Sequence, residues 1–343
     1  MKWTVELGSP QAYLQPHMTT AKPTLAHTPL KVCIVIPCYN EEGVLKHTTD
    51  VLLAELKTLA AANKVTQDSF ICCVDDGSRD GTWAEILALS AQCQDISGLK
   101  LSANFGHQNA LVAGLFTMRS RAQVLITIDA DLQDDVSVIG RMVDEHLAGK
   151  RVVYGVRLDR TVDVLPKRIA ADLYYRVIRQ MNHRMVRGHA DFRSADAQVV
   201  ADLERFGEVN LYLRGIFPLI GYPSSTVSYA RKERHAGDSK YSYAKLASLA
   251  WQGVTSFTTT PLRLVFYMGL IMFLFSCAIA AWVIWAILTE QTVQGWASTL
   301  LFILFFSSCN LIGLGVIGEY VGKIYTEVKR RPRYIIESST SNG

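Results

Sequence analysis

Two carboxylates, separated by a single residue, follow an apolar run near the middle of the chain. Asp129 and Asp131 close the segment VLITIDAD, and Gln133 stands two residues further on. Carboxylate and amide oxygens are hard ligands of the kind that Mg²⁺ and Mn²⁺ prefer. A metal ion held there would neutralise negative charge that develops on a diphosphate leaving group. The spacing therefore predicts a divalent metal site, and the alternative is an acidic turn that caps a helix.

Two further polar clusters follow apolar runs closer to the N-terminus. Tyr39 and Glu41 come just after VCIVIP, which ends at Pro37, and Asp75 and Asp76 end the run FICCVDD. Carboxylates at these positions can accept hydrogen bonds from ribose hydroxyls or from a base N–H. The second cluster would also form a turn and a helix start without any ligand, so both interpretations stay open.

These polar clusters must be positioned by the elements between them. From residue 31 onward, short β-branched runs alternate with amphipathic segments, which predicts an α/β fold with a mostly parallel sheet and helices on both faces. Because ligands bind at the carboxyl ends of parallel strands, the clusters should converge on one site. Strands are expected within 32–37, 70–76, 99–106, 124–131 and 152–157, and helices from about residue 41, after residue 81 and over 107–119.

The chain becomes more basic after the last of these strands. A basic helical stretch runs from Pro166 to Arg187, the tetrapeptide ADFR occupies Ala190 to Arg193, and a basic segment extends from Arg231 to Lys240. We expect the last two segments to be loops that cap the open edge of the sheet.

Two long uncharged runs, Leu264–Leu288 and Trp296–Ile317, lie near the C-terminus. Each is long enough to cross a bilayer core of roughly 30 Å. The connection TEQTVQG contains no Lys or Arg, whereas basic residues flank the outer end of each run, which favours cytoplasmic termini. The preceding segment 240–262 has the composition of a helix at the membrane interface. The sequence therefore predicts a transmembrane hairpin with the strand-end site in the cytoplasm.

Composition excludes several classes of protein. The net charge of +4 over 343 residues comes without a basic stripe interleaved with aromatics, so nucleic-acid binding is not expected. Seven cysteines without metal-ligand or disulfide spacing indicate free thiols in a reducing compartment. The stretch through Thr28 lacks the apolar core of a signal peptide and is expected to be loosely ordered.

Several longer motifs recur in one known family: VCIVIPCYNEE, VDDGSRDGT, NFGHQNALVAG, DADLQDD, ADFR, RHAGDSKYS, TTPLRL and GEYVGKIYTEVKRRPRY. Through these motifs the chain, from about Lys31 to Ile336, resembles the bacterial polyprenyl-phosphate glycosyltransferases of glycosyltransferase family 2. It is particularly similar to bactoprenol (undecaprenyl-phosphate) glucosyltransferases. It implies a GT-A catalytic domain over 31–239. Around that domain we expect a loosely ordered segment 1–30, an interfacial region 240–262, two transmembrane helices within 263–318 and a cytoplasmic tail 319–343.

The resemblance also implies roles for individual residues in a metal-dependent, inverting transfer. The catalytic residues would be Asp131 and Asp191. The metal ion and the diphosphate would be held by Asp129, Asp131 and Gln133. The nucleoside would contact Pro37, Tyr39, Glu41, Asp75 and Asp76. Donor or acceptor phosphates would be bound by Arg157, Arg231, Arg234 and Lys240, each of which could instead belong to a solvated basic face.

The function implied is transfer of a hexose, most readily glucose from UDP-glucose, onto undecaprenyl phosphate at the cytoplasmic face of the bacterial inner membrane. A phosphate monoester has its second pKa near 6, so the acceptor can attack without a strong base. Asp191 would orient the acceptor, stabilise positive charge on the sugar or accept a residual proton, and its alternative is a salt bridge with Arg193. Expected partners are a nucleotide-sugar donor, the membrane, a second copy of the chain, and a flippase and downstream transferase serving O-antigen-type modification.

Two alternatives to this function stay open. One is the same reaction with another donor, such as GDP-mannose, UDP-GlcNAc or a UDP-aminoarabinose. The other is a non-catalytic membrane partner that binds nucleotide. Ala103 stands where many relatives have Arg, and Asp135 where many have Pro. The first departure leaves open how the donor phosphates are held, and His107 could compensate.

Overall fold

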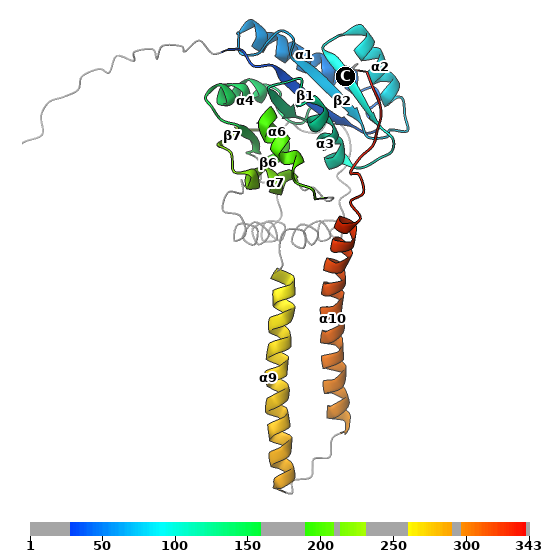
Figure 1. The fold of residues 1–343 in the computed structure, drawn as a ribbon, viewed down its shortest axis with the longest axis vertical. Coiled ribbons are helices and arrows are strands. Elements are labelled where there is room, and N and C mark those ends of the chain that lie inside the picture. The colour runs from blue at the N-terminus through cyan, green and yellow to red at the C-terminus, as the bar shows by residue number, and fades with distance from the viewer. Residues whose placement is uncertain (1–27, 159–188, 209–212, 231–259, 290–295, 341–343) are drawn as a thin grey trace, which may run out of the picture.

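The computed structural model describes residues 28–158, 189–208, 213–230, 260–289 and 296–340 (Figure 1). Its described residues form one eight-stranded sheet in the order β7-β5-β6-β4-β1-β2-β3-β8. The strands are β1 (Val32–Cys38), β2 (Phe70–Asp75), β3 (Ile96–Leu101), β4 (Val124–Thr127), β5 (Val152–Arg157), β6 (His189–Asp196), β7 (Ser224–Tyr229) and β8 (Ile336–Ser339).

Most neighbouring strands are parallel, which confirms the fold class expected from the sequence. The pairs β1·β2, β1·β4, β2·β3 and β5·β7 are parallel, whereas β6 is antiparallel to both β4 and β5, and β8 is antiparallel to β3. The expectation that ADFR lies in an edge loop is therefore wrong, because Ala190–Arg193 forms part of β6 in the interior of the sheet.

Residues of β6 alternate between the two faces of the sheet, as the period of a strand requires. Ala190 and Phe192 are buried in the core on one face, whereas Arg193 is buried against Phe217 on the other. Asp191 and Arg193 are charged residues at alternate positions, a pattern typical of a half-exposed strand or a loop. In β6 both are largely buried because they form an ion pair with each other.

Helices cover both faces of the sheet (Figure 1). The core on one face contains buried residues of α1 (Leu45–Ala61), α2 (Thr82–Gln92) and α4 (Val138–Leu147). The core on the other face contains buried residues of α3 (His107–Met118), α6 (Ala197–Glu204) and α7 (Leu213–Ile220). Gly114 of α3 allows this helix to lie close to the sheet, since a Cβ there would come within 2.4 Å of Val35.

Two long helices extend from the domain, α9 (Thr260–Leu288) and α10 (Trp296–Val328). Their segments Pro261–Ile279 and Phe305–Val328 are long and apolar enough to cross a membrane, and 0% and 6% of these segments is buried. Large apolar side chains on both helices are exposed, for example Phe266 at 67% and Leu311 at 69%. By length and composition, these two helices are candidates to cross a membrane.

The C-terminal segment returns to the eight-stranded sheet. The sequence analysis predicted a tail over 319–343. In the structure α10 continues to Val328, and β8 then pairs with the edge of β3. The backbone N–H of Ser102 donates to the carbonyl of Ile335 at 2.9 Å, and Lys100 pairs with Glu337 at 3.0 Å. These contacts tie the segment that follows α10 to the sheet.

Candidate active site

The register between β4 and β6 brings two acidic residues together. Thr127 of β4 pairs with Arg193 of β6, and the strands run in opposite directions. Asp129 lies two residues beyond the end of β4, and Asp191 lies two residues before Arg193 in β6, so a continuation of this register sets Asp129 and Asp191 opposite one another. The Thr127 hydroxyl donates to the Asp191 carbonyl at 2.5 Å and fixes this arrangement.

The turn that carries Asp129 and Asp131 is held in shape by its neighbours. Leu132 has a positive φ of 49°, which lets the chain reverse directly after Asp131. Thr48 of α1 donates to the carbonyl of Ala130 at 2.6 Å. The Gln133 side-chain amide donates to Asp131 at 2.6 Å, and its backbone N–H donates to the other carboxylate oxygen at 3.2 Å. Gln133 therefore orients Asp131 in this structure.

Asp191 is an ion-paired carboxylate whose side chain is only 11% exposed. Arg193 donates to Asp191 Oδ1 at 2.5 Å, while Arg214 of α7 donates through Nε at 3.2 Å and through Nη2 at 2.8 Å. Burial alone would raise the pKa of Asp191, but Arg193, Arg214 and the nearby His107 hold it well below its usual range. Asp191 is therefore ionised at neutral pH and is a weak base.

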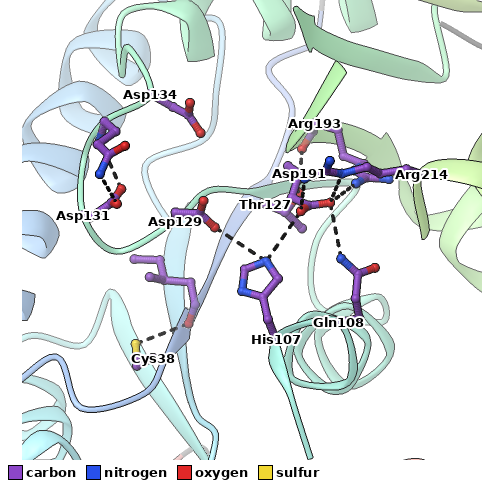
Figure 2. Close-up of polar contacts among 12 residues, drawn as sticks. Cys38, His107, Gln108, Thr127, Asp129, Asp131, Asp134, Asp191, Arg193 and Arg214 are labelled. Atoms are coloured by element: carbon purple, nitrogen blue, oxygen red, sulfur yellow. Dashed lines mark hydrogen bonds and ion pairs between the residues drawn. The ribbon is translucent and has the colours of Figure 1, made fainter. Parts of the chain in front are cut away.

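His107 and Gln108, the first residues of α3, approach this carboxylate from the other side (Figure 2). His107 Nε2 lies 3.6 Å from Asp129 Oδ1 and 3.7 Å from Asp191 Oδ2, so the imidazole stands between the two acidic residues. Gln108 donates to Asp191 at 3.4 Å and accepts from the backbone N–H of Leu213 at 3.2 Å. These contacts tie the start of α3 to the start of α7.

A second buried carboxylate lies behind the acidic turn. Asp134, 2% exposed, accepts from the Tyr229 hydroxyl at 2.6 Å and from Arg157 Nη2 at 3.0 Å. The Tyr229 hydroxyl also accepts from Arg157 Nε at 3.2 Å. Arg157, predicted to bind phosphate, is thus anchored to protein groups, although a guanidinium carries five N–H donors and can serve two partners.

The predicted nucleoside residues lie at the ends of β1 and β2. Asp76 accepts from the backbone N–H groups of Phe105 and Gly106 at 2.7 and 3.0 Å, so it holds the loop before α3. Burial raises the pKa of Asp76, and the two backbone donors offset part of that effect. Asp75 is fully buried, and its Oδ1 accepts from Ser78 N at 3.1 Å while Oδ2 has no hydrogen-bond partner among the described residues. A buried acceptor without a donor is a position for a ligand N–H or O–H.

Hydrogen bonds in both directions join the loop after β1 to the loop after β2. Asn40 accepts from the backbone N–H of Arg79 at 2.9 Å, and its own N–H donates to Ser78 at 3.0 Å. Glu41 N–H donates to the Thr82 hydroxyl at 2.9 Å. Pro37 is buried within β1, whereas Tyr39 is 41% exposed. The strand-end loops therefore form one rigid platform with Tyr39 at its surface.

Gly77 brings this platform against the loop that contains Ala103. It has a φ of +67°, and a Cβ there would lie 2.4 Å from the Ala103 carbonyl carbon. Gly77 therefore combines a backbone conformation and a close approach that only glycine tolerates. The platform at the strand ends consequently extends to a third strand, β3.

The structure brings most predicted site residues to one edge of the sheet. The predicted Arg231, Arg234 and Lys240 lie outside the described residues, as do the basic stretch Pro166–Arg187 and residues 1–27. Sequence reasoning assigned no role to Thr127, Gln108, Asp134, Arg214 or Tyr229. Asp134 lies within the quoted motif DADLQDD, but nothing in the sequence indicated which cation it would pair with.

The acidic turn offers part of a divalent metal site. No group of three or more His, Cys, Asp or Glu side chains in the described ranges is arranged to hold a metal ion. Asp131 is exposed and Asp129 is 40% exposed, so both can reach a ligand in the open edge. Mg²⁺ is commonly held by one or two carboxylates together with substrate phosphates. The residues present therefore fit a metal ion whose other ligands come from a diphosphate.

Asp129 lies in a strongly acidic environment. Burial raises its pKa, and the charges of Asp134, Asp191 and Asp131 add to that effect while His107 opposes it. A cation bound between these groups would favour the ionised carboxylate.

The mostly parallel sheet with paired carboxylates at its strand ends agrees with the GT-A fold expected from the sequence. The sequence model of glycosyl transferase family 2 matches residues 33–200. The uncharacterized glycosyltransferase YkoT of Bacillus subtilis (strain 168) is 42% identical over 309 residues, which cover 90% of this chain and 92% of that protein. The chain belongs to glycosyltransferase family 2.

Two other relatives carry more specific names. The bactoprenol glucosyl transferase of Shigella phage SfX is 37% identical over 313 residues, covering 90% of this chain and 99% of that protein. The prophage bactoprenol glucosyl transferase homolog of Escherichia coli (strain K12) is 36% identical over 312 residues, with the same shares covered.

Proposed function

We propose that this enzyme transfers glucose from UDP-glucose onto undecaprenyl phosphate at the cytoplasmic face of a bacterial inner membrane. The observation that carries the proposal is the two-ended site, in which the acidic turn at Asp129 and Asp131 faces the ion-paired Asp191. Relatives named bactoprenol glucosyl transferase cover almost the full chain and support the choice of sugar and lipid.

The acidic end suits the donor. Asp129 and Asp131 would hold a divalent metal ion, which would supply positive charge to the departing diphosphate. The platform formed by the β1 and β2 ends would bind the uridine, with the unpartnered Asp75 Oδ2 as the acceptor for a base or ribose donor. Tyr39, at 41% exposure, has the surface on which a base can stack.

The other end of the site suits an acceptor that brings its own nucleophile. Asp191 has a depressed pKa and two guanidinium partners, so it would not remove a proton during transfer. A phosphate monoester is largely dianionic at neutral pH and needs no base. Of the roles expected for Asp191, this environment disfavours the acceptance of a proton and is compatible with orienting the acceptor through the arginine partners or with stabilising positive charge on the sugar.

The transfer itself would be one displacement. A non-bridging oxygen of the lipid phosphate forms the bond to C1 of glucose while the C1–O bond to the β-phosphate breaks and its electron pair leaves with UDP. No proton has to move in this step. Attack opposite to the leaving group inverts the α linkage of the donor into a β-linked glucosyl phospholipid.

The apolar helices support a membrane-bound acceptor. We propose that α9 and α10 both span the bilayer and that the catalytic domain and both termini are cytoplasmic, as the distribution of Lys and Arg indicates. The proposal includes the division of the chain into a catalytic domain that ends at residue 239, an interfacial region that ends at 262, and a transmembrane hairpin that ends at 318.

The test is a donor panel. Purified full-length protein in bilayers containing undecaprenyl phosphate would be given UDP-glucose, UDP-GlcNAc or GDP-mannose, each with Mn²⁺, Mg²⁺ or a chelator. We expect metal-dependent lipid labelling from UDP-glucose and release of a β-linked sugar phosphate on mild hydrolysis. Preferential labelling from another donor would replace the sugar and keep the reaction, whereas nucleotide binding without any transfer would contradict the enzymatic proposal.

A further inference from the structure

The two cations that pair with Asp191 differ in their access to solvent. Arg193 is 2% exposed and its guanidinium carbon lies 5.0 Å from the centre of the Phe217 ring, so it is enclosed by protein. Arg214 also donates two hydrogen bonds to Asp191, but 39% of its side chain is exposed. Arg193 can therefore neutralise Asp191 from within the protein, while Arg214 is accessible to a ligand.

Charge is distributed unevenly along the site. Two guanidinium groups surround the single carboxylate of Asp191, whereas Asp129 and Asp131 lie in the acidic turn (Figure 2). His107 stands between the two ends, within 3.7 Å of a carboxylate oxygen at each. A metal-bound diphosphate suits the acidic end, and a second phosphate suits the end with the excess of cations.

Arg214 lies on the side of the domain from which a lipid headgroup would arrive. Helix α7, which carries it, lies at the edge of the domain nearest α9 and α10 (Figure 1). The backbone next to Arg214 is fixed, because Leu213 N–H donates to Gln108 Oε1 at 3.2 Å. The Arg214 guanidinium therefore extends from a backbone that is held in place by this hydrogen bond.

Resting on the proposed function, we propose that Arg214 binds the phosphomonoester of the lipid acceptor and guides it to the sugar. On arrival, a phosphate oxygen replaces an Asp191 oxygen as a partner of the guanidinium, and Asp191 keeps its pairing with the buried Arg193. A planar guanidinium can hold one phosphate oxygen and one carboxylate oxygen at once, whereas a lysine ammonium is a point charge without this geometry.

The experiment measures steady-state transfer by the full chain with donor and acceptor varied separately. Arg214→Gln should raise the KM for undecaprenyl phosphate about 10- to 100-fold, the loss of one or two charge-assisted hydrogen bonds. The KM for UDP-glucose should stay within about two-fold. Arg214→Lys should give an intermediate KM for the lipid. A larger effect on the UDP-glucose KM, or no effect on either KM, would overturn the proposal.

Arg205→Gln is the matched control. Arg205 also pairs with an aspartate, Asp202, but its side chain is 83% exposed and it lies after α6, outside the site. The Arg205→Gln substitution should leave the KM for undecaprenyl phosphate and the KM for UDP-glucose unchanged. The affinity of each variant for UDP, measured by calorimetry, reports whether the donor end is folded. If Arg214→Gln fails to bind UDP, the Lys variant carries the test.

Two sources of phosphate have to be distinguished. A short-chain, water-soluble prenyl phosphate in detergent presents the acceptor phosphate without a bilayer, and Arg214→Gln should raise its KM by a similar factor. A defect seen only with vesicles of anionic phospholipid would mean that Arg214 contacts bulk headgroups, which would overturn the proposal. If the wild-type protein transfers no sugar to any acceptor, the proposed function fails, independently of Arg214.

Discussion

Arg193 donates a hydrogen bond of 2.5 Å to Asp191, two residues earlier on the same strand, and both side chains are almost withdrawn from solvent. Residues two apart on a strand share a face, so this ion pair is built into β6 itself. The pair explains why a central strand can carry two charges through the core. It also fixes Asp191 as an ionised group before any substrate arrives.

Replacing Asp191 with Asn should destabilise the protein as well as inactivate it. The change leaves the buried Arg193 without its carboxylate, and breaking a buried ion pair costs about 3–5 kcal/mol. We expect the Tm of the full chain in detergent to fall by roughly 6–15 °C. Glu204→Gln, which removes an exposed ion pair with Arg119, should lower it by less than about 3 °C. Equal Tm values for Asp191→Asn and wild type would contradict the structural role given to Arg193.

The pH dependence of transfer should follow the acceptor and not Asp191. The pKa of Asp191 is held well below its usual range, so this carboxylate stays ionised throughout the assay. Ionisation of the lipid phosphate, with its second pKa near 6, should make kcat/KM for the acceptor rise from pH 5 to pH 7 and then level off. A phosphonate acceptor with a higher second pKa should move the rise to higher pH. A rise that stays in place with the phosphonate would indicate a base on the enzyme.

Tyr229→Phe should weaken catalysis through the turn that carries the acidic residues. The change removes the 2.6 Å hydrogen bond to Asp134, which also pairs with Arg157. We expect kcat to fall about 10- to 150-fold, since a bond to a charged acceptor contributes roughly 1.5–3 kcal/mol.

Tyr222→Phe is the control for this change. Tyr222 also donates at 2.6 Å to an aspartate, Asp202, but this pair lies at α6, away from the acidic turn. It should leave kcat within about two-fold of wild type. Similar losses of kcat in both tyrosine variants would show that the effect is a general loss of stability.

His146 should make the domain less stable in mild acid. It is 9% exposed, bonds to Ser194 of β6 at 2.8 Å, and burial lowers its pKa from 6.5 to about 4. The unfolded chain therefore binds the proton more readily, so stability falls as the pH drops from about 6.5 towards 4, by up to roughly 3 kcal/mol. His146→Gln should reduce the decrease in Tm between pH 7.5 and pH 5. An unchanged decrease would show that other groups cause it.

The sequence predicted the parallel part of the sheet and the residues at its strand ends. Apolar runs such as VCIVIP are buried on both sides, and polar residues appear only where those runs reach the open edge. Asp75, Asp129 and Asp131 could be assigned to one edge for this reason. Local composition was sufficient for β1 and β2, whereas β3 spans Ile96–Leu101 and not 99–106, and β4 ends at Thr127 and not at Asp131.

The antiparallel elements could not be predicted in the same way. ADFR was assigned to a loop that caps the open edge of the sheet, and the burial of Arg193 depends on contacts with Asp191 of the same strand and with Phe217 of α7. Likewise, the pairing of Arg157 with Asp134 and Tyr229 joins β5, the acidic turn and β7. Such contacts between distant segments follow from the strand order, which a single sequence does not reveal.

The most direct test of the proposed reaction compares two lipids that differ only in the phosphate. Purified protein with Mn²⁺ and radiolabelled UDP-glucose would be supplied with undecaprenyl phosphate or with undecaprenol, alongside Asp131→Asn. We expect label only in undecaprenyl phosphate, with the rate reduced at least about 100-fold in the variant, comparable to the loss of one preorganised electrostatic contact in other active sites. Labelling of undecaprenol, or full activity of Asp131→Asn, would contradict phosphate attack at a site organised by the acidic turn.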